Sequence, residues 1–411
     1  MDLHSGLSFW IVKNELFDYF HPLEDDYSID VAIIGSGITG ALVAHELCEA
    51  GIECVIIDKR TLVTGSSAAS TAQLQYEIDI PLCKLVEKVT EKRAIDAYHN
   101  CLQSIKDLEN VFKSNNIQTD FLNVPTVFLA STKQDIKLLE DEYAMRTKVG
   151  LPINFLDSNE LKLYQNIDGY AALQNDTSAQ MDAYKGAIKL LKHHQKKHSL
   201  QIFTHTKIDK IMETIDGCEL FTSKGKKIKC KYVIVAAGFE AGEFLPKKVM
   251  NLLSTYVIIS SPMPEEKIWP HRSLIWETAD PYLYMRTTKD NRLIVGGEDE
   301  DFQNPVKRDD LLREKIKTLE QKFKKLYPTI EFKTEMAWCG TFSSTEDGLP
   351  FMGPWKKNSR ILYALGYGGN GITFSMIAAQ VLKNSILNKK DDRMITFGFS
   401  RILDCKKNKI N

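Results

Sequence analysis

Hydrophobic and polar positions near the N-terminus follow a strand, helix, strand pattern. Residues 30–34 form a short β-branched run, and residues 35–40 form a glycine-rich turn. A segment with helical periodicity then ends at Gly51, and a second β-branched run ends at Asp58. This order predicts two strands joined by a tight turn and a helix.

The pattern farther along the chain predicts more helices and a second group of strands. Helical periodicity covers about Pro81–Ser114, which is rich in Lys, Glu and Leu, and residues 183–199 predict a basic amphipathic helix. Apolar or alternating runs predict strands at 124–130, 201–211, 231–238 and 252–260, and a hairpin over 281–297 with Asp290 and Asn291 at its turn.

These segments predict an α/β protein of two domains, one of which is discontinuous. A Rossmann-like nucleotide-binding domain is expected to resume after the first strands of a substrate domain with a mixed or antiparallel β-sheet. The predicted ranges are 1–28 for an N-terminal extension, 29–115, 178–250 and 336–390 for the nucleotide domain, 116–177 and 251–335 for the substrate domain, and 391–411 for a C-terminal surface tail.

The glycine-rich turn carries the first chemical information. Gly35, Gly37 and Gly40 form G-x-G-x-x-G between the first strand and its helix, and Asp58 closes the second strand. Gly35 permits the tight turn, and Gly37 lets the backbone approach a pyrophosphate at the helix N-terminus. Asp58 is positioned to accept hydrogen bonds from a ribose. The pattern therefore predicts a bound adenine dinucleotide, the alternative being a turn used only for packing.

Composition narrows the classes of partner. The chain has 411 residues, of which 43% are hydrophobic and 26% charged, so a disordered chain is excluded. The 53 basic and 54 acidic side chains give a net charge of -1, too even to attract nucleic acid or an anionic membrane over a distance. A small molecule is the expected partner, and no nucleic-acid partner is expected.

Cysteine usage and the N-terminus predict a cytoplasmic location. The 8 cysteines form no C-x-x-C and no dense spacing, so neither a disulfide framework nor a zinc knuckle is indicated. Residues 1–20 lack a basic start and a cleavable apolar core, and later apolar stretches are interrupted by charge. We expect no signal peptide and no membrane span.

Separated sequence blocks, taken together, resemble the FAD-dependent D-amino acid oxidase family, which includes glycine oxidase, sarcosine oxidase and gamma-glutamylputrescine oxidase. The resemblance spans Asp30 to about Asn388. It rests on the G-x-G-x-x-G unit, on VIVAAG at 233–238, on WCGTFSSTEDGLPFMG from Trp338 and on ALGYGGNGIT at 364–373. The leader LSFW and the loop GSSAASTAQLQ are most similar to the gamma-glutamylputrescine oxidase branch.

The resemblance implies non-covalent FAD and a set of residues that hold it. The residues implied are Gly35, Ser36, Gly37, Ile38 and Thr39 at the pyrophosphate, Asp58 with Lys59 and Arg60 at the ribose, Ser66, Ser67, Ala72 and Gln73 along the flavin, Ile208 at the adenine, Ala237 and Gly238 near the phosphates, and Gly369, Asn370, Gly371, Ile372 and Thr373 at flavin N1 and C2. A covalent link through Cys339 is the alternative. Counting back from Asp347, however, the cysteine of some relatives falls at Gly340.

The implied reaction moves hydride from the carbon beside an amine to flavin N5 and leaves an imine, which water hydrolyses. The electron acceptor is oxygen or another molecule, because Ile294 stands where sarcosine-oxidase-like relatives place a lysine. The residue set from which we expect substrate contacts or catalysis is Arg286, Tyr284, Tyr256 and Asn370, with Tyr282 and Tyr367 as further aromatic walls.

The family's carboxylate anchors are missing here. Phe342 stands in the place of the arginine of glycine and D-amino acid oxidases, and Thr373 in the place of a sarcosine-oxidase lysine. The resemblance therefore implies either an amine without an α-carboxylate or another cation that takes over, for which Arg286 is the candidate.

Two other functions stay open, and a metal site is not expected. The FAD could be structural or accessory in a complex, or the chain could be an oxidoreductase domain for RNA modification, which the near-neutral charge disfavours. His193, His194 and His198, with His205, are interpreted as part of a solvated basic face rather than as metal ligands. Composition does not indicate an oligomeric state.

Overall fold

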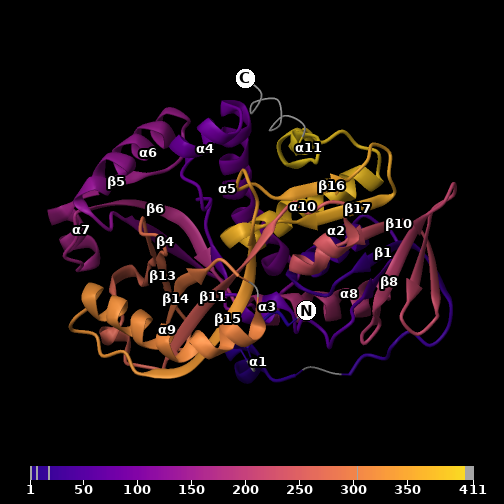
Figure 1. The fold of residues 1–411 in the computed structure, drawn as a ribbon, viewed down its shortest axis with the longest axis horizontal. Coiled ribbons are helices and arrows are strands. Elements are labelled where there is room, and N and C mark those ends of the chain that lie inside the picture. The colour runs from indigo at the N-terminus through magenta and orange to yellow at the C-terminus, as the bar shows by residue number, and fades with distance from the viewer. Residues whose placement is uncertain (1, 6–7, 17–18, 303, 403–411) are drawn as a thin grey trace.

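Two β-sheets organise the protein in this computed structural model, which describes all residues except 1, 6–7, 17–18, 303 and 403–411 (Figure 1). Helices pack around both sheets, and the chain passes between the sheets several times. The fold is therefore a mixed α/β arrangement with two sheets, as the hydrophobic pattern predicts.

The smaller, eight-stranded sheet has a parallel centre. Its strands are β1 (Tyr27–Ile34), β2 (Cys54–Ile57), β7 (Gln201–Phe203), β8 (Ile208–Glu213), β9 (Cys218–Thr222), β10 (Lys227–Val235), β16 (Phe351–Pro354) and β17 (Ile361–Leu365). The strand order is β16-β17-β10-β1-β2-β7, with β9 pairing β10 and β8 pairing β9. The central strands end in continuous apolar runs because both of their faces are buried.

The larger, nine-stranded sheet is mainly antiparallel. Its strands are β3 (Gln73–Leu74), β4 (Leu122–Leu129), β5 (Asn154–Asp157), β6 (Ala171–Gln180), β11 (Asn251–Ser260), β12 (Leu274–Glu277), β13 (Leu283–Thr287), β14 (Leu293–Glu300) and β15 (Thr334–Ser344). The order is β15-β11-β14-β13-β12-β4-β6-β3, with β5 pairing β6. Among the strands of the described residues, β12 and β4 form the one parallel pair of this sheet. The predicted hairpin at 281–297 is confirmed as the β13–β14 pair.

The helices cover the sheets and fill the space beside them. They are α1 (Phe9–Asn14), α2 (Ile38–Glu49), α3 (Ser66–Ala69), α4 (Leu82–Lys88), α5 (Glu91–Ser114), α6 (Ile136–Lys148), α7 (Ser158–Gln165), α8 (Ala183–His198), α9 (Pro305–Leu326), α10 (Gly371–Ile386) and α11 (Arg393–Phe397). Helices α2 and α10 pack against the smaller sheet, and α8 packs against α2, whereas α9 packs against β11, β14 and β15 of the larger sheet.

Helix α8 forms as predicted, but its histidines are not all solvated. His194 is fully buried and faces His45 of α2, and His193 and His198 flank it. The interpretation of this segment as a solvated basic face is wrong for His194, because that residue lies on the side of α8 that packs against α2. His205 lies apart and stacks on Tyr19.

Segments far apart in sequence build each sheet. The smaller sheet takes strands from residues 27–57, 201–235 and 351–365, in line with the expectation that the nucleotide domain is discontinuous. The predicted boundary at 336 falls inside β15, which pairs with β11 in the larger sheet. The division into domains stays a prediction, and the structure moves this strand to the substrate side of it.

The prediction of a surface tail over 391–411 is wrong for the part that the structure describes, which ends at residue 402. Helix α11 packs against β16 and α5, and Phe397 and Phe399 are buried. Arg401 is fully buried beside Asp347. The apolar residues of the segment explain its docking, because they bury against the smaller sheet.

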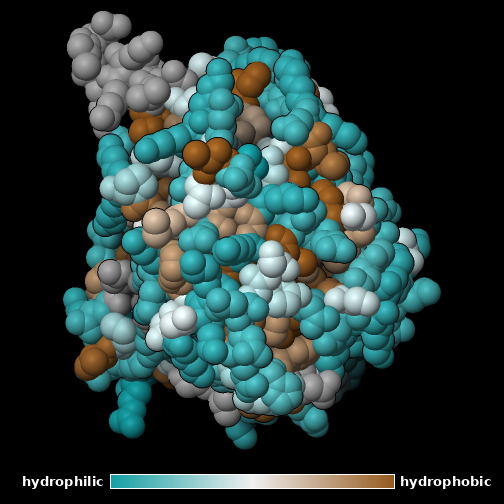
Figure 2. Space-filling model, turned by 90° about the vertical axis from the view of Figure 1, so that its right-hand side faces the viewer, coloured by the Kyte–Doolittle hydropathy of each residue, from teal (hydrophilic) through white to brown (hydrophobic). Residues whose placement is uncertain are grey.

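Among the described residues, no helix is both long and apolar enough to cross a membrane. The face in Figure 2 is mainly hydrophilic, with apolar side chains scattered between charged and polar ones.

Candidate functional site

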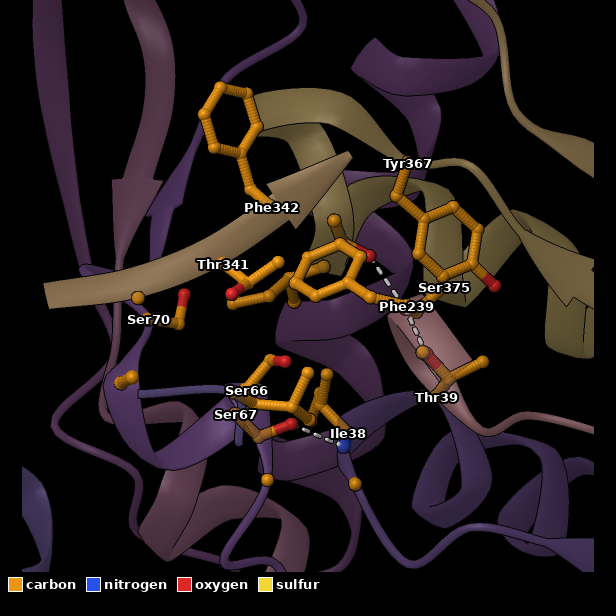
Figure 3. A pocket seen from close by; sticks show the side chains of 18 of the residues that line it. Ile38, Thr39, Ser66, Ser67, Ser70, Phe239, Thr341, Phe342, Tyr367 and Ser375 are labelled. Atoms are coloured by element: carbon orange, nitrogen blue, oxygen red, sulfur yellow. Dashed lines mark hydrogen bonds between the residues drawn. The ribbon is translucent and has the colours of Figure 1, made fainter. Parts of the chain in front are cut away.

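A pocket is lined by residues from both sheets and by the glycine-rich turn after β1. Figure 3 shows part of its wall. Gly35 has φ +111°, and a Cβ there would lie 2.4 Å from the Ala236 carbonyl oxygen. A Cβ on Gly40 would lie 1.9 Å from the Gly35 oxygen. Glycine is therefore required at both positions. Gly37 caps α2, and the Ile38 amide donates to Ser67 Oγ at 2.9 Å.

Asp58 is held in place at the carboxyl end of β2. One carboxylate oxygen accepts from the Ser36 amide at 2.8 Å and from the Ser36 hydroxyl at 2.6 Å, and the other accepts from the Arg60 amide at 2.8 Å. Asp58 lines the pocket, whereas Ser36 does not. Ser36, predicted to contact the cofactor, instead orients Asp58.

Lys59 and Arg60 line the same end and share an acidic partner that the sequence did not indicate. Lys59 Nζ lies 2.8 Å from one Glu240 oxygen, and Arg60 Nη1 lies 2.7 Å from the other. Burial opposes ionisation of Glu240, but hydrogen bonds from Arg60 and Lys59 outweigh it and lower the pKa of Glu240 to about 2. Glu240 follows VIVAAG on a short turn, where no motif marks it.

Most of the predicted cofactor residues meet in this one pocket. Those that line it are Gly35, Gly37, Ile38, Thr39, Asp58, Lys59, Arg60, Ser66, Ser67, Ala72, Gln73, Ile208, Ala237, Gly238, Gly369, Asn370, Gly371 and Ile372. Thr373 is buried behind the wall, where its hydroxyl donates to the Asn370 carbonyl at 2.9 Å. Figure 3 shows Ile38, Thr39 and the serines of α3 on one side and Thr341 of β15 across from them.

Two polar side chains of the pocket wall have atoms that fit a bound polar molecule. Ser66 Oγ and Gln73 Nε2 are buried and have no hydrogen-bond partner among the described residues. Buried polar groups without partners are costly, so these atoms fit a bound polar molecule. The glycine cradle, the Asp58 carboxylate in the pocket wall and these free donors together fit FAD.

Comparison with known proteins decides the family. The model of the DAO family, described as FAD-dependent oxidoreductase, matches residues 30–384. The chain belongs to this family. Gamma-glutamylputrescine oxidoreductase from Escherichia coli (strain K12) is 24% identical over 392 residues, which are 91% of this chain and 87% of that protein.

Solved structures of this FAD-dependent oxidoreductase family share the fold. Glycine oxidase from Geobacillus kaustophilus superposes with a TM-score of 0.75 at 20% identity, over 91% of this chain and 98% of that chain. L-alpha-glycerophosphate oxidase from Mycoplasma pneumoniae, a structure with FAD bound, gives a TM-score of 0.74 at 17% identity, over 88% and 95%. FAD is the cofactor of this oxidoreductase, as the sequence predicts.

Side-chain hydrogen bonds fix the backbone of residues 68–72, which run along the predicted flavin position and are called the flavin loop. Each backbone carbonyl from Ala68 to Ala72 accepts a hydrogen bond from a side chain. The donors are Ser8 Oγ to Ala68, Trp338 Nε1 to Ala69 at 2.9 Å, Trp10 Nε1 to Ser70 at 2.6 Å, and Arg286 Nη1 to Thr71 at 2.6 Å and to Ala72 at 3.0 Å. With its carbonyls fixed on one side, the loop presents Ser66, Ser67 and Gln73 to the pocket.

Arg286 is therefore not the substrate anchor that the sequence suggested. It is absent from the pocket lining, and its guanidinium also donates to the Met181 carbonyl at 2.8 Å and lies over the Trp10 ring. Burial among carbonyl acceptors uses the donors that a substrate carboxylate would need. Arg286 is a positioning residue for the flavin loop.

Tyr256 likewise does not line the pocket, contrary to the prediction from the sequence. Its ring packs with α9 on the far face of the larger sheet, whereas its neighbours Thr255 and Val257 line the pocket. Adjacent residues of a strand face opposite sides of the sheet. The prediction that Tyr256 faces the pocket is therefore off by one residue along β11. Tyr284, Tyr282, Tyr367 and Asn370 do line the pocket.

Cys339 faces the same way as Tyr256, because it lies opposite Tyr256 in the β11–β15 pair. It is fully buried, and its thiol lies 3.2 Å from Asp309 of α9. Gly340 lines the pocket and Cys339 does not. This position favours the proposal that FAD is not linked through Cys339.

The far end of the pocket carries carboxylates that no motif marked. Asp79 accepts from the Gly369 amide at 2.8 Å, and its oxygens lie against Gly368 and Gly369. Asn370 beside them donates to the Gln75 carbonyl at 3.1 Å and to the Glu77 carbonyl at 2.6 Å. The Asp79 side chain is exposed in this structure, but the protein atoms around it raise its pKa, although the Gly369 hydrogen bond opposes the shift.

Asp299 on β14 places a second carboxyl group beside this end. Its Oδ1 is buried and has no hydrogen-bond partner in the described chain. Burial, together with the charge of Asp79, raises the pKa of Asp299 to about 7. The charges of Asp299 and Asp79 also reach Tyr282, so all of these groups belong to one neighbourhood.

Replacing Trp10 by phenylalanine is expected to weaken FAD binding about fivefold, the loss of one hydrogen bond of about 1 kcal/mol. Reconstitution of apoprotein with FAD, followed by flavin fluorescence, measures the dissociation constant. Trp269→Phe is the matched control, since Trp269 Nε1 donates to the Ser273 carbonyl at 2.9 Å inside the larger-sheet core. Equal effects of both substitutions would show that Trp10 acts only through general stability.

Proposed function

We propose that this FAD-dependent oxidoreductase oxidises the C–N bond of a cationic amine that carries no carboxylate beside the reacting carbon. The observation that carries the proposal is the charge of the pocket. Among the described lining residues, lysine and arginine occur only as Lys59, Arg60 and Lys207, which share the end of Asp58 and Ile208. The opposite end has Asp79, with Asp299 beside it, so it attracts an ammonium group and repels a carboxylate.

Aromatic side chains add to the carboxylates in binding the ammonium group of the substrate. Tyr282, Tyr284 and Trp276 line the pocket near the acidic end and offer faces that attract a cation. Tyr284 is fixed in place, because its ring packs so closely over Gly296 that a Cβ there would lie 2.3 Å from the ring. Half-buried Phe342 of β15 lines the pocket as well and cannot bind a carboxylate.

Bound FAD would supply the hydride acceptor, flavin N5. The substrate loses a hydride from carbon and a proton from nitrogen, and water hydrolyses the resulting imine. The ammonium form must therefore give up protons before or during the reaction. Asp79 Oδ1 is suited to accept one of these protons, because a raised pKa makes the carboxylate a stronger base.

A panel of substrates tests the proposal through the colour of the flavin. The purified holoenzyme is mixed without oxygen with diamines, acylated diamines and primary monoamines, and with glycine and N-methylglycine as carboxylate-bearing controls. We expect amines to bleach the flavin absorption and the amino acids to leave it unchanged. Bleaching by glycine alone contradicts the substrate class, and no bleaching by any amine favours an accessory FAD. Reoxidation by oxygen or by a dye then identifies the acceptor class.

A further inference from the structure

A second cluster of chemically active side chains lies where α2 packs against α8, and the flavin site does not use it. His45 and Glu49 are four residues apart and therefore share one face of α2. His194 of α8 faces them, and its Nε2 lies 2.9 Å from His45 Nδ1. One potential ligand atom from each of these three residues lies within 4.8 Å of the others.

We propose that His45, Glu49 and His194 bind one divalent transition-metal ion of the Zn²⁺ class. Zinc takes imidazole nitrogens at about 2.0–2.1 Å and carboxylate oxygens at about 2.0–2.2 Å, which separates ligands around a tetrahedral ion by about 3.4 Å. The two imidazole nitrogens need to part by only about 0.5 Å to reach that spacing. Glu49 needs a small inward movement, which its position at the end of α2 permits.

Burial and supporting contacts fit a metal site. The His45 and His194 side chains are 7% and 0% exposed, so their nitrogens are shielded from water, whereas the Glu49 side chain is 40% exposed and leaves a route of entry. Lys197 lies 2.7 Å and His198 lies 3.4 Å from the same Glu49 oxygen. Such outer contacts orient a ligating carboxylate, and the other oxygen stays available.

The neighbouring thiols favour zinc and related ions over Mg²⁺ and Ca²⁺. Cys48 on α2 interacts with the His194 ring, and its sulfur lies 3.9 Å from that of Cys54. Imidazole with a nearby thiol suits zinc and related ions, whereas Mg²⁺ and Ca²⁺ prefer oxygen ligands alone. The ion would tie α8 to the C-terminal end of α2, the helix whose other end begins at the FAD-binding glycine turn.

Metal titration of the FAD-loaded full chain tests the site. The holoenzyme is treated with EDTA, dialysed and titrated with Zn²⁺, and in a parallel sample with Co²⁺, whose visible absorption reports the coordination geometry. We expect one ion per chain and a higher melting temperature with the metal bound. Failure of the wild-type holoenzyme to retain zinc after dialysis would overturn the proposal.

Matched variants separate the site from adventitious binding to surface histidines. His194→Gln should abolish binding, and Glu49→Gln, at an exposed position that tolerates the change, should weaken it at least tenfold. Glu46→Gln on α2 and His193→Gln on α8 should bind like the wild type. Equal losses in His193→Gln and His194→Gln, or no loss in Glu49→Gln, contradict the assignment. FAD absorbance measured in each sample verifies that the variants are folded.

Discussion

Asp79→Asn should lower kcat/KM for the amine substrate about 100-fold. Asp79 is exposed in this structure, but the bound amine and FAD would cover it, and truncating one partner of a desolvated charge pair costs about 2–5 kcal/mol. The asparagine oxygen can still accept from the Gly369 amide, so the turn that carries Asn370 should persist. FAD content, measured by absorbance, should therefore not change. The rate of anaerobic flavin reduction at several amine concentrations measures the effect.

The pH dependence distinguishes loss of charge from loss of structure. As pH falls through the raised pKa of Asp79, the carboxylate is neutralised and the ammonium loses its counter-charge, so KM should rise on the acid side. Asp79→Asn should lose the part of this acid limb that Asp79 contributes, whereas the part contributed by Asp299, whose pKa is raised to about 7, should remain. Asp280→Asn is the control, since Asp280 is an exposed acid near the same end that does not line the pocket. An acid limb that is unchanged in Asp79→Asn would contradict the assignment.

The parts of the site that the sequence predicts are those built by local chain geometry. Gly35, Gly37 and Gly40 act within one turn, and Asp58 ends the next strand, so spacing alone places them together. The two classes of sheet also follow from local alternation and from the apolar runs. The family resemblance adds the glycine turn at Gly369, whose position depends on a distant strand.

The missed features depend on contacts between distant segments or on strand register. Tyr256 and Thr255 exchange roles through a shift of one residue, which no single-strand pattern fixes. Asp79 follows a short strand and meets Gly369 only in the folded chain. His45 and His194 lie on separate helices. The basic residues around His194 predict a solvent-exposed face, whereas in the folded chain α2 packs against α8 and buries His194.

The C-terminal segment is the clearest example of a feature that the sequence misses because it depends on a distant contact. Arg401 connects this segment to the turn at Asp347. Arg401 Nε donates to Asp347 at 2.5 Å, and Nη1 donates to the Pro350 and Phe397 carbonyls at 2.6 and 3.0 Å. The guanidinium also lies 3.8 Å from the centre of the Phe351 ring. A buried charge with this many partners is matched only while all of them are present.

Arg401→Met should destabilise the protein by about 3–5 kcal/mol, since it leaves the buried Asp347 carboxylate without its counter-charge. Urea unfolding of the holoenzyme, followed by far-UV circular dichroism and by flavin fluorescence, measures the loss. Adding Asp347→Asn should restore part of the stability, because the stranded charge is then removed. Lys390→Met is the control from the same segment, as its ion pair with Asp392 is solvated and should contribute little. A loss in Arg401→Met no larger than in Lys390→Met would mean that residues 391–402 behave as the surface tail that the sequence suggested.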